Sequence, residues 1–160
     1  MRLYHGSLEI VRTPKIIKPT RTLDYGNGFY TTTSYEQAEQ WVRRRMTSPM
    51  NIGYVNIYEI DDSKTSDMDI LWFDELTEKW VDFVMFNRTS KDFEHNHDIV
   101  YGPVANDRVY AAFALYEGGF LDKEGLIKEL KTYKLTDQML FHTIKSLKHL
   151  KYIEAKEIIL

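Results

Sequence analysis

The chain has 160 residues with a net charge of −3, and 43% of its residues are hydrophobic and 14% aromatic. This length suits a single domain, residues 1–160, with enough apolar residues to bury a core. Cysteine is absent, which excludes disulfides, thiolate nucleophiles and cysteine-ligated zinc. The first residues, MRLYHGSLEI, lack the apolar segment of a secretory signal, and no run is long enough to span a bilayer. We therefore expect a cytoplasmic protein with no membrane partner.

Charge is unevenly distributed along the chain. Residues 1–45 contain eight Lys or Arg and four Asp or Glu, whereas residues 46–120 contain five and fourteen. A basic N-terminal third favours a phosphate-bearing ligand. The acidic middle argues against a broad nucleic-acid interface, because duplex binding needs a contiguous basic surface. Alternatively, the uneven charge only reflects solvated surfaces that have no functional role.

The N-terminal half mixes short strands with helices. Apolar alternation predicts a strand at RLYHGSL, and FYTT is typical of another. Between them, Gly26 and Gly28 indicate a tight turn, because glycine tolerates positive φ and close backbone approach. Thr33 and Ser34 are N-cap candidates for the next helix, in which we expect Trp41 to face inward. The predicted elements of this half are strands at residues 2–8, 29–32 and 52–61 and helices at residues 34–46 and 73–88.

The C-terminal half continues without a strict alternation of strand and helix. Asn106 or Asp107 is expected to begin a helix that ends near Tyr116, with Gly118 as its stop signal. The remaining predicted elements are strands at residues 98–104, 138–143 and 152–160 and helices at residues 122–133 and 143–150. Because helices and strands are mixed in this way, the sequence favours the α+β class over a parallel α/β fold.

Two short polar motifs match known site patterns only weakly. Gly26-Asn27-Gly28 is neither a dinucleotide-binding fingerprint nor a phosphate-binding loop, since the remaining glycines and the lysine are missing. The segment HNHD places His95 and His97 on one face of an extended chain next to Asp98. Two histidines without a third well-spaced ligand are a weak metal motif, and we predict no metal site.

One constellation resembles a known fold. The motif LYHGS, followed by GNGFYTT and an alanine-bearing helix, resembles the ADP-ribosyltransferase fold, in its diphtheria-toxin-like and poly(ADP-ribose) polymerase-like branch. His5 and Gly6 match the His-Gly pair of that branch's first strand. Gly28 and Tyr30 fall in its Gly-x-Gly-hydrophobic-Tyr motif, and Trp41 stands where that branch has a second aromatic, a tyrosine.

A narrower resemblance extends over nearly the whole chain. The motifs LYHGS and GFYTT, the helix with QA..W and a late Q..F.T element are similar to those of an uncharacterised bacterial family, DUF3990. The polymerase-like motifs themselves cover only residues 1–45. The fold that the resemblance implies is an α+β, ADP-ribosyltransferase-like domain. We accordingly expect two small, roughly perpendicular antiparallel or mixed sheets around a central cleft, with flanking helices.

The resemblance implies that NAD⁺ is bound as a substrate. A flat, electron-poor nicotinamide ring would lie between Tyr30 and Trp41. The N–H and C=O of Gly6 would hold its amide, and His5 would donate to the adenosine-side ribose. Thr31 would bond ribose or brace the turn. The full set of expected binding residues is His5, Gly6, Ser7, Gly28, Phe29, Tyr30, Thr31 and Trp41, with Arg12 and Arg21 as candidates for the pyrophosphate.

The implied reaction is cleavage of the nicotinamide N-glycosidic bond through a transition state with positive charge on the ribose. The expected catalytic residues are His5, Tyr30 and Gln138. Related enzymes place a glutamate at the third position, where it stabilises that charge. Gln138 is neutral and accepts or donates hydrogen bonds only. The adjacent Asp137 is a second candidate, although on a strand it would point to the opposite face.

The leading hypothesis is therefore an NAD-dependent mono-ADP-ribosyltransferase acting on an unknown macromolecular acceptor. A bacterial toxin or effector role, with an antitoxin or other neutralising protein as partner, would suit such a stand-alone domain. The alternative hypothesis is a catalytically weak or inactive module on the same fold that binds NAD⁺ or ADP-ribose. A third possibility is a protein-interaction domain in which the aromatic residues only form the core.

Overall fold

A computed structural model describes residues 1–18, 23–48, 51–61, 63, 65–90 and 94–160 of the chain. The protein has the α+β architecture that the sequence predicts. Its strands are β1 (Arg2–Ser7), β2 (Phe29–Thr32), β3 (Ile52–Ile60), β4 (Ile70–Trp72), β5 (Ile99–Pro103), β6 (Asp137–Phe141) and β7 (Leu150–Ile159). Its helices are α1 (Tyr35–Arg45), α2 (Glu78–Thr89), α3 (Asp107–Glu117), α4 (Lys123–Leu130) and α5 (Ile144–Leu147). Within the described ranges, no helix has the length and apolar character required to cross a membrane.

The strands form one hydrogen-bonded sheet in the order β4-β5-β6-β2-β1-β3-β7. The edge strand β4 runs parallel to β5, and every other neighbouring pair is antiparallel. The expected mixed sheet, with both parallel and antiparallel pairs, is confirmed. The expectation of two separate sheets is wrong, because hydrogen bonds join all the strands into one sheet. The reason is that β1 and β2 still share one pair of residues, Tyr4 and Thr32, which joins the two halves.

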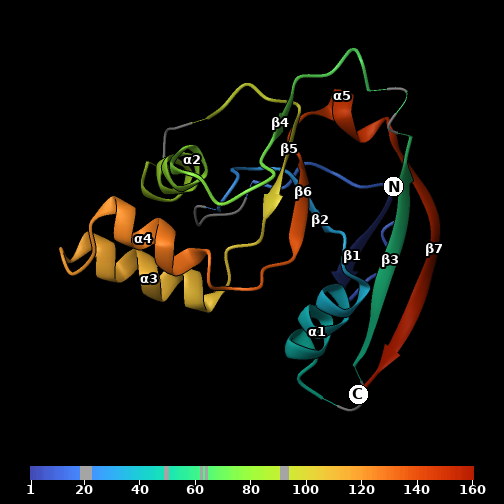
Figure 1. The fold of residues 1–160 in the computed structure, drawn as a ribbon. Coiled ribbons are helices and arrows are strands. Elements are labelled where there is room, and N and C mark those ends of the chain that lie inside the picture. Colours follow the sequence, from blue (N-terminus) through green and yellow to red (C-terminus); the bar gives the residue numbers. More distant parts are fainter. Residues whose placement is uncertain (19–22, 49–50, 62, 64, 91–93) are drawn as a thin grey trace.

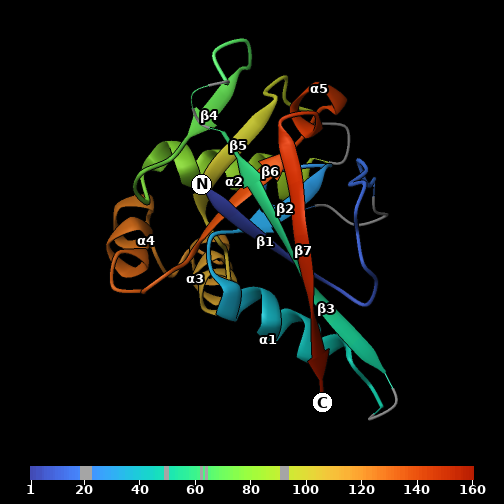
Figure 2. The same cartoon turned by 90° about the vertical axis from the view of Figure 1, so that its right-hand side faces the viewer.

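The junction between β1 and β2 is the weakest seam of the sheet. On its other side β1 pairs with β3 along its whole length, from Arg2 to Ser7, and β2 pairs with β6 at all four of its residues. Figure 2 shows β1 and β2 crossing at an angle, with β3 and β7 extending beyond them. The two halves of the sheet thus diverge immediately past Tyr4 and Thr32, at the level of His5 and Gly6.

The helices α1 to α4 cover one face of the sheet in two separate groups. Figure 1 shows α2, α3 and α4 together beside β5 and β6, while α1 lies apart from them against β1 and β3. The first group buries Trp80, Phe113 and other apolar side chains against Val100 and Leu140. The helix α1 buries Ala38 and Val42 against β3. The opposite face of the sheet carries its own core, which includes Leu3, Phe29 and Met139.

Helix caps account for most of the observed helix boundaries. The side chain of Ser34 accepts from the Gln37 N–H and begins α1, and Asn106 caps α3 in the same way. Thr77 caps α2, which therefore starts at Glu78. The predicted start, residue 73, is five residues too early. The sequence analysis missed β4 altogether, because three residues at a sheet edge carry no detectable alternation.

The turn that leads into β2 requires a glycine at position 28. Its φ is +149°, and a Cβ atom there would lie 2.4 Å from the backbone oxygen of Phe141 in β6. Only a residue without a side chain lets the turn approach β6 this closely. Gly119 also has a positive φ, +81°, but a Cβ atom there would meet nothing within 4 Å.

These two glycines provide a matched stability test. We expect Gly119→Ala to lower the free energy of unfolding by about 1–2 kcal/mol, the usual cost of a side chain at positive φ. Gly28→Ala should cost about 1–3 kcal/mol more, because it also forces overpacking against β6. Urea unfolding of both variants measures the difference, and equal losses would contradict the close approach of this turn to β6.

Candidate functional site

Gly6 is the point at which α1 comes closest to the sheet. A Cβ atom on Gly6 would lie 2.5 Å from the backbone oxygen of Ala38 and 2.7 Å from Val42 Cγ2. Both distances are shorter than any allowed contact, so the residue must be glycine for α1 to pack here. Trp41 Cε3 would lie only 3.3 Å from this Cβ atom. The indole edge of Trp41 therefore lies against the backbone of Gly6.

The backbone groups of Gly6 point toward the seam between β1 and β2. Met1 and Ile60 exchange both backbone hydrogen bonds, at 3.1 and 3.0 Å. Because bonded pairs alternate along an antiparallel ladder, the odd-numbered residues of β1 bond to β3 and the even-numbered ones face β2. The pairing of β1 with β2 in the described residues is limited to Tyr4. The N–H and C=O of Gly6 thus face the side on which the strands have begun to separate.

His5 bridges this seam with its side chain. Its Nδ1 lies 2.7 Å from the backbone oxygen of Tyr30, and its ring packs on Phe29 with a centroid distance of 4.3 Å. Burial lowers the pKa of His5, and the bond to the Tyr30 carbonyl opposes this only in part. A neutral ring that donates from Nδ1 leaves Nε2 as a hydrogen-bond acceptor. His5 would therefore accept from a ligand hydroxyl, where the sequence analysis expected it to donate.

Tyr30 holds the preceding turn through its hydroxyl group. The hydroxyl donates to the Gly26 backbone oxygen at 2.6 Å and accepts from the Tyr25 N–H at 3.0 Å. Burial raises the pKa of Tyr30 well above its usual value, so the phenol stays neutral. Continuing the β1–β2 register past Tyr4 and Thr32 places Tyr30 opposite Gly6. Gly6 thus has Tyr30 opposite it in the register and Trp41 of α1 packed near it.

Trp41 faces outward, contrary to the sequence prediction. Its side chain is 40% exposed, and the buried positions of α1 are Ala38 and Val42. The reason is that Gly6 lets the backbone of α1 touch the sheet, which leaves no room beneath the helix for an indole. The guanidinium of Arg45 lies over the exposed ring at 4.4 Å. Trp41 therefore borders Gly6 while presenting a ring to solvent.

Gln138 points into a buried polar cluster. It is 7% exposed, and its Nε2 donates to the Pro103 backbone oxygen at 3.5 Å. The hydroxyl of Tyr25 donates to the same oxygen at 2.8 Å and accepts from Trp80 Nε1 at 2.8 Å. The carboxylate of Asp137 lies on the other face of β6 and accepts from the Tyr101 hydroxyl at 2.8 Å. In the part of the chain that the structure describes, the side chains of these two candidates thus bond to Pro103 and Tyr101 of β5 and not to His5 or Tyr30.

The side chains of the other expected binding residues are engaged in contacts within the protein. Phe29 and Thr31 alternate with Tyr30 along β2 and so point to the opposite face. Phe29 is 2% exposed, and the Thr31 hydroxyl donates to the Met139 backbone oxygen at 2.8 Å. The Ser7 hydroxyl accepts from the Glu9 N–H at 3.1 Å. These contacts leave Gly6, Tyr30 and Trp41 on the face of the sheet that α1 covers. The His5 ring lies with Phe29 on the other face and reaches this group through the Tyr30 backbone oxygen.

The two arginines proposed for the pyrophosphate are not part of this group. The guanidinium of Arg12 lies 5.9 Å from the ring centroid of Tyr152 in β7. Arg21 lies outside the described residues. Arg45, which the sequence analysis did not single out for this role, is the basic side chain in contact with Trp41.

A second group of polar residues near Tyr30 was missed. The Tyr110 hydroxyl donates to Asp24 Oδ1 at 3.0 Å, and Arg88 Nε lies 3.9 Å from the same oxygen. The guanidinium of Arg88 also covers the Tyr110 ring at 3.9 Å. These residues come from the 23–28 turn, α2 and α3, so no local motif connects them. Only the packing of α2 and α3 on the sheet reveals them.

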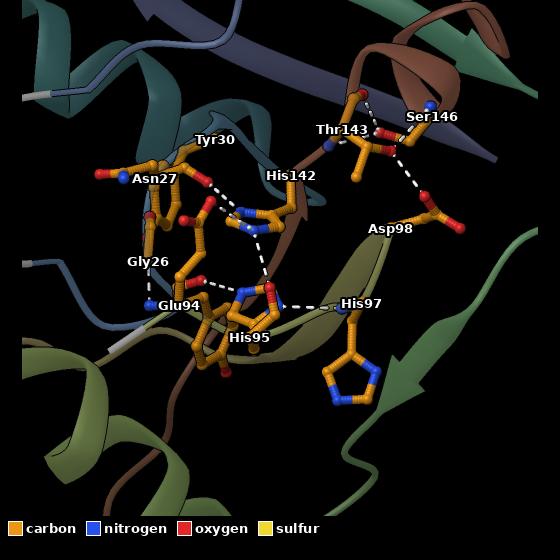
Figure 3. A network of polar contacts seen from close by, with 11 residues as sticks. Gly26, Asn27, Tyr30, Glu94, His95, His97, Asp98, His142, Thr143 and Ser146 are labelled. Carbon is orange, nitrogen blue, oxygen red and sulfur yellow. Dashed lines mark hydrogen bonds and ion pairs between the residues drawn. The ribbon is translucent and has the colours of Figure 1, made fainter. Parts of the chain in front are cut away.

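The histidines of the HNHD segment have separate partners. His95 Nε2 lies 2.7 Å from the Tyr25 backbone oxygen, while His97 Nδ1 lies 2.9 Å from Asp69 Oδ1. Across the described ranges, no group of three or more His, Asp or Glu side chains has the arrangement of a metal site. His142 and His149 also have partners, the Asn27 backbone oxygen (Figure 3) and the Asp67 carboxylate.

Comparison with known proteins gives one family. The protein-family model described as "Protein of unknown function (DUF3990)" matches residues 1–152. No curated protein and no solved structure matches the chain. The matched range includes His5, Gly6, Tyr30 and Trp41.

Removing the Tyr30 hydroxyl tests its role in the turn. Tyr30→Phe should lower the free energy of unfolding by about 1–3 kcal/mol, because the Tyr25 N–H and the Gly26 carbonyl lose a buried partner. The half-buried Tyr133, whose hydroxyl makes an exposed hydrogen bond to Glu129 at 3.0 Å, is the matched control. Tyr133→Phe should cost no more than about 0.5 kcal/mol. Similar losses in the two variants, measured by denaturant unfolding, would refute the anchoring role.

Proposed function

The chain belongs to the DUF3990 family, and from the geometry of its site we propose that it is an NAD-dependent mono-ADP-ribosyltransferase. The observation that carries this proposal is the convergence of Gly6, Tyr30 and Trp41 at the seam that His5 bridges. We also propose the ADP-ribosyltransferase-like fold on this basis. The two halves of the sheet, joined at the β1–β2 seam, would correspond to the two sheets of that fold.

The nicotinamide end of NAD⁺ would bind at Gly6. Its carboxamide is both a donor and an acceptor, and the backbone of Gly6 directs both kinds of group toward the β1–β2 seam. An aromatic ring placed there would have Trp41 on one side and Tyr30 on the other, and such stacking favours an electron-poor ring. Arg45, which covers Trp41, is an exposed side chain that can move aside and pair with a phosphate.

His5 would recognise a ribose. With Nδ1 occupied by the Tyr30 carbonyl, the ring keeps one acceptor, Nε2, for a hydroxyl group. Because burial lowers the pKa of His5, this acceptor stays available at neutral pH. The bond to Tyr30 fixes the ring orientation, so ligand binding would require little further ordering.

The reaction would break the C1′–N bond between ribose and nicotinamide. Nicotinamide leaves neutral with the electron pair, and positive charge develops on the ribose carbon. A nucleophile of the acceptor then forms the new bond to C1′ and releases its proton to solvent. His5, Tyr30 and Gly6 would orient the dinucleotide, but none of them carries a negative charge. We therefore expect slow turnover compared with an enzyme that has a carboxylate at this point.

The second candidate function is NAD⁺ or ADP-ribose binding without cleavage. The burial of Gln138 against Pro103 favours it, because an amide engaged there is not directed at a ligand. Replacement by glutamate would bring a carboxylate close to the Pro103 carbonyl, which disfavours the charged form. The same binding site serves both functions, so one set of variants separates them. In either case we propose that a toxin or effector role would involve a macromolecular acceptor and a neutralising protein.

The test uses a substitution at His5 that keeps one of its hydrogen bonds. In His5→Asn the amide nitrogen takes the place of Nδ1, keeps the bond to the Tyr30 carbonyl and removes Nε2. We expect the fold to remain intact and NAD⁺ affinity, measured by calorimetric titration, to fall about tenfold through loss of one hydrogen bond. Nicotinamide release, followed by chromatography, should fall with it. Unchanged affinity and release in a folded His5→Asn variant would remove His5 from the site.

A pair of exposed tryptophans provides a control. Trp41 and Trp72 have similar exposure, 40% and 44%, but Trp72 lies on β4 at the far edge of the sheet. Trp41→Ala should weaken NAD⁺ binding about two- to tenfold through loss of ring stacking, and Trp72→Ala should not change it. Binding by the wild type without any nicotinamide release would select the second candidate function. Absence of binding would contradict both.

A further inference from the structure

An exposed pair of stacked aromatic rings lies at one edge of the sheet. Trp72 of β4 is the register partner of Tyr101 of β5, and the two rings are nearly parallel, with centroids 3.7 Å apart at an angle of 16°. Figure 2 shows β4 beside β5, at the end of the molecule away from α1. Within the described ranges β5 is the one strand that pairs with β4. The indole face that Tyr101 leaves uncovered therefore turns outward from the sheet, and Trp72 is 44% exposed.

Hydrogen bonds hold both rings in place. Trp72 Nε1 donates to Asp74 Oδ1 at 2.7 Å, and the Tyr101 hydroxyl donates to Asp137 Oδ2 at 2.8 Å. The stacking contact restrains the two rings further. A surface side chain that is already fixed loses little conformational freedom when a partner binds to it. The outer face of Trp72 is thus a preorganised flat surface.

Two carboxylates meet at these rings without a cation between them. Burial, the bond to Asp137 and the charges of Asp137 and Asp74 raise the pKa of Tyr101 to about 12. Both carboxylates therefore act on the same hydroxyl group. Across the described ranges, no Lys, Arg or His side chain forms an ion pair with either of them. The acidic aromatic surface consists of Trp72, Tyr101, Asp74 and Asp137.

Other aromatic rings near the surface of the protein carry a cation of their own. The guanidinium of Arg45 lies over Trp41, the other exposed tryptophan, at 4.4 Å. The same kind of contact recurs in the pairs Arg12–Tyr152, Arg88–Tyr110, Arg108–Tyr133 and Lys156–Tyr35. In the part of the chain that the structure describes, no cation lies over Trp72. The ring with two carboxylates beside it thus presents its outer face to solvent.

We propose that the acidic aromatic surface is a docking site for an arginine side chain in a basic segment of a partner protein. The flat guanidinium would lie on the outer face of Trp72, as Arg45 lies on Trp41, and donate to the Asp74 carboxylate beside the ring nitrogen. Arginine fits this surface better than lysine, because its planar group both stacks on a ring and pairs with a carboxylate. The two negative charges repel phosphate groups, so they disfavour nucleic acids and anionic lipids.

This surface is separate from the seam between β1 and β2. In the sheet, β6 and β2 lie between β5 and β1. Docking of an arginine at Trp72 therefore does not depend on the proposed NAD-dependent function. A test without NAD⁺ keeps the failure of either idea distinct from that of the other.

The probe is the peptide acetyl-Arg-Gly-Arg-Gly-Arg-amide, titrated at low ionic strength into ¹⁵N-labelled protein. The indole N–H signals of the three tryptophans are followed by NMR. We expect a saturable shift of the Trp72 signal, without a shift at Trp41 or the buried Trp80. The same peptide with citrulline, a neutral analogue of arginine of nearly the same shape, should bind about tenfold more weakly, because it lacks the charge. A lysine peptide should also bind more weakly.

A matched pair of charge-removing variants isolates the local carboxylate. In Asp74→Asn the amide oxygen can still accept from Trp72 Nε1, so the ring stays in place while the charge is lost. The dissociation constant of the arginine peptide should rise about three- to tenfold. Glu117 is exposed at the end of α3, far from β4 (Figure 1), and Glu117→Gln should leave this constant unchanged.

Several outcomes would overturn the proposal. These are no Trp72 shift at the highest peptide concentration, equal affinity for the citrulline or lysine peptide, and equal effects of Asp74→Asn and Glu117→Gln. A Trp72 signal that shifts with protein concentration alone would identify a second copy of the chain as the occupant, which also contradicts it. The citrulline comparison uses the wild type, so it decides the matter even if Asp74→Asn does not fold.

Discussion

The bond from His5 Nδ1 to the Tyr30 carbonyl is the interaction on which the candidate site depends. It joins β1 and β2 where their backbone pairing has ended, so the strands stay together without closing the ladder. Because a side chain occupies the Tyr30 carbonyl, the backbone of Gly6 remains directed at the seam. Close packing of α1 on Gly6 then brings Trp41 to the same point. An anchoring bond, a glycine and one helix contact together define the site.

The turn before β2 is a second constraint, and it is supported from two sides. The Tyr30 hydroxyl holds it through the Gly26 carbonyl, and His95 and His142 hold it through the carbonyls of Tyr25 and Asn27. The turn is therefore not an isolated flexible connection. Its position is tied to the end of β6 and the start of β5.

Local sequence patterns predicted most elements of the fold. His5, Gly6 and Tyr30 could be singled out because their motifs resemble those of the ADP-ribosyltransferase fold. The direction of Trp41 could not, since helical periodicity treats Gly6 as an ordinary neighbour and misses the close approach of α1. Likewise, the sequence gives no sign that Gln138 faces Tyr25 and Pro103. That contact depends on how α2 closes over the sheet.

Gly6 offers the most direct measurement of the central claim. Nicotinamide, or its unreactive analogue benzamide, is titrated into ¹⁵N-labelled protein, and the backbone amide of Gly6 is followed by NMR. The account predicts a saturable downfield shift of the Gly6 amide proton, because its N–H gains a carbonyl partner, together with a shift of the Trp41 indole signal. No movement of the Gly6 amide at saturating ligand, or shifts confined to other parts of the sheet, would contradict the account.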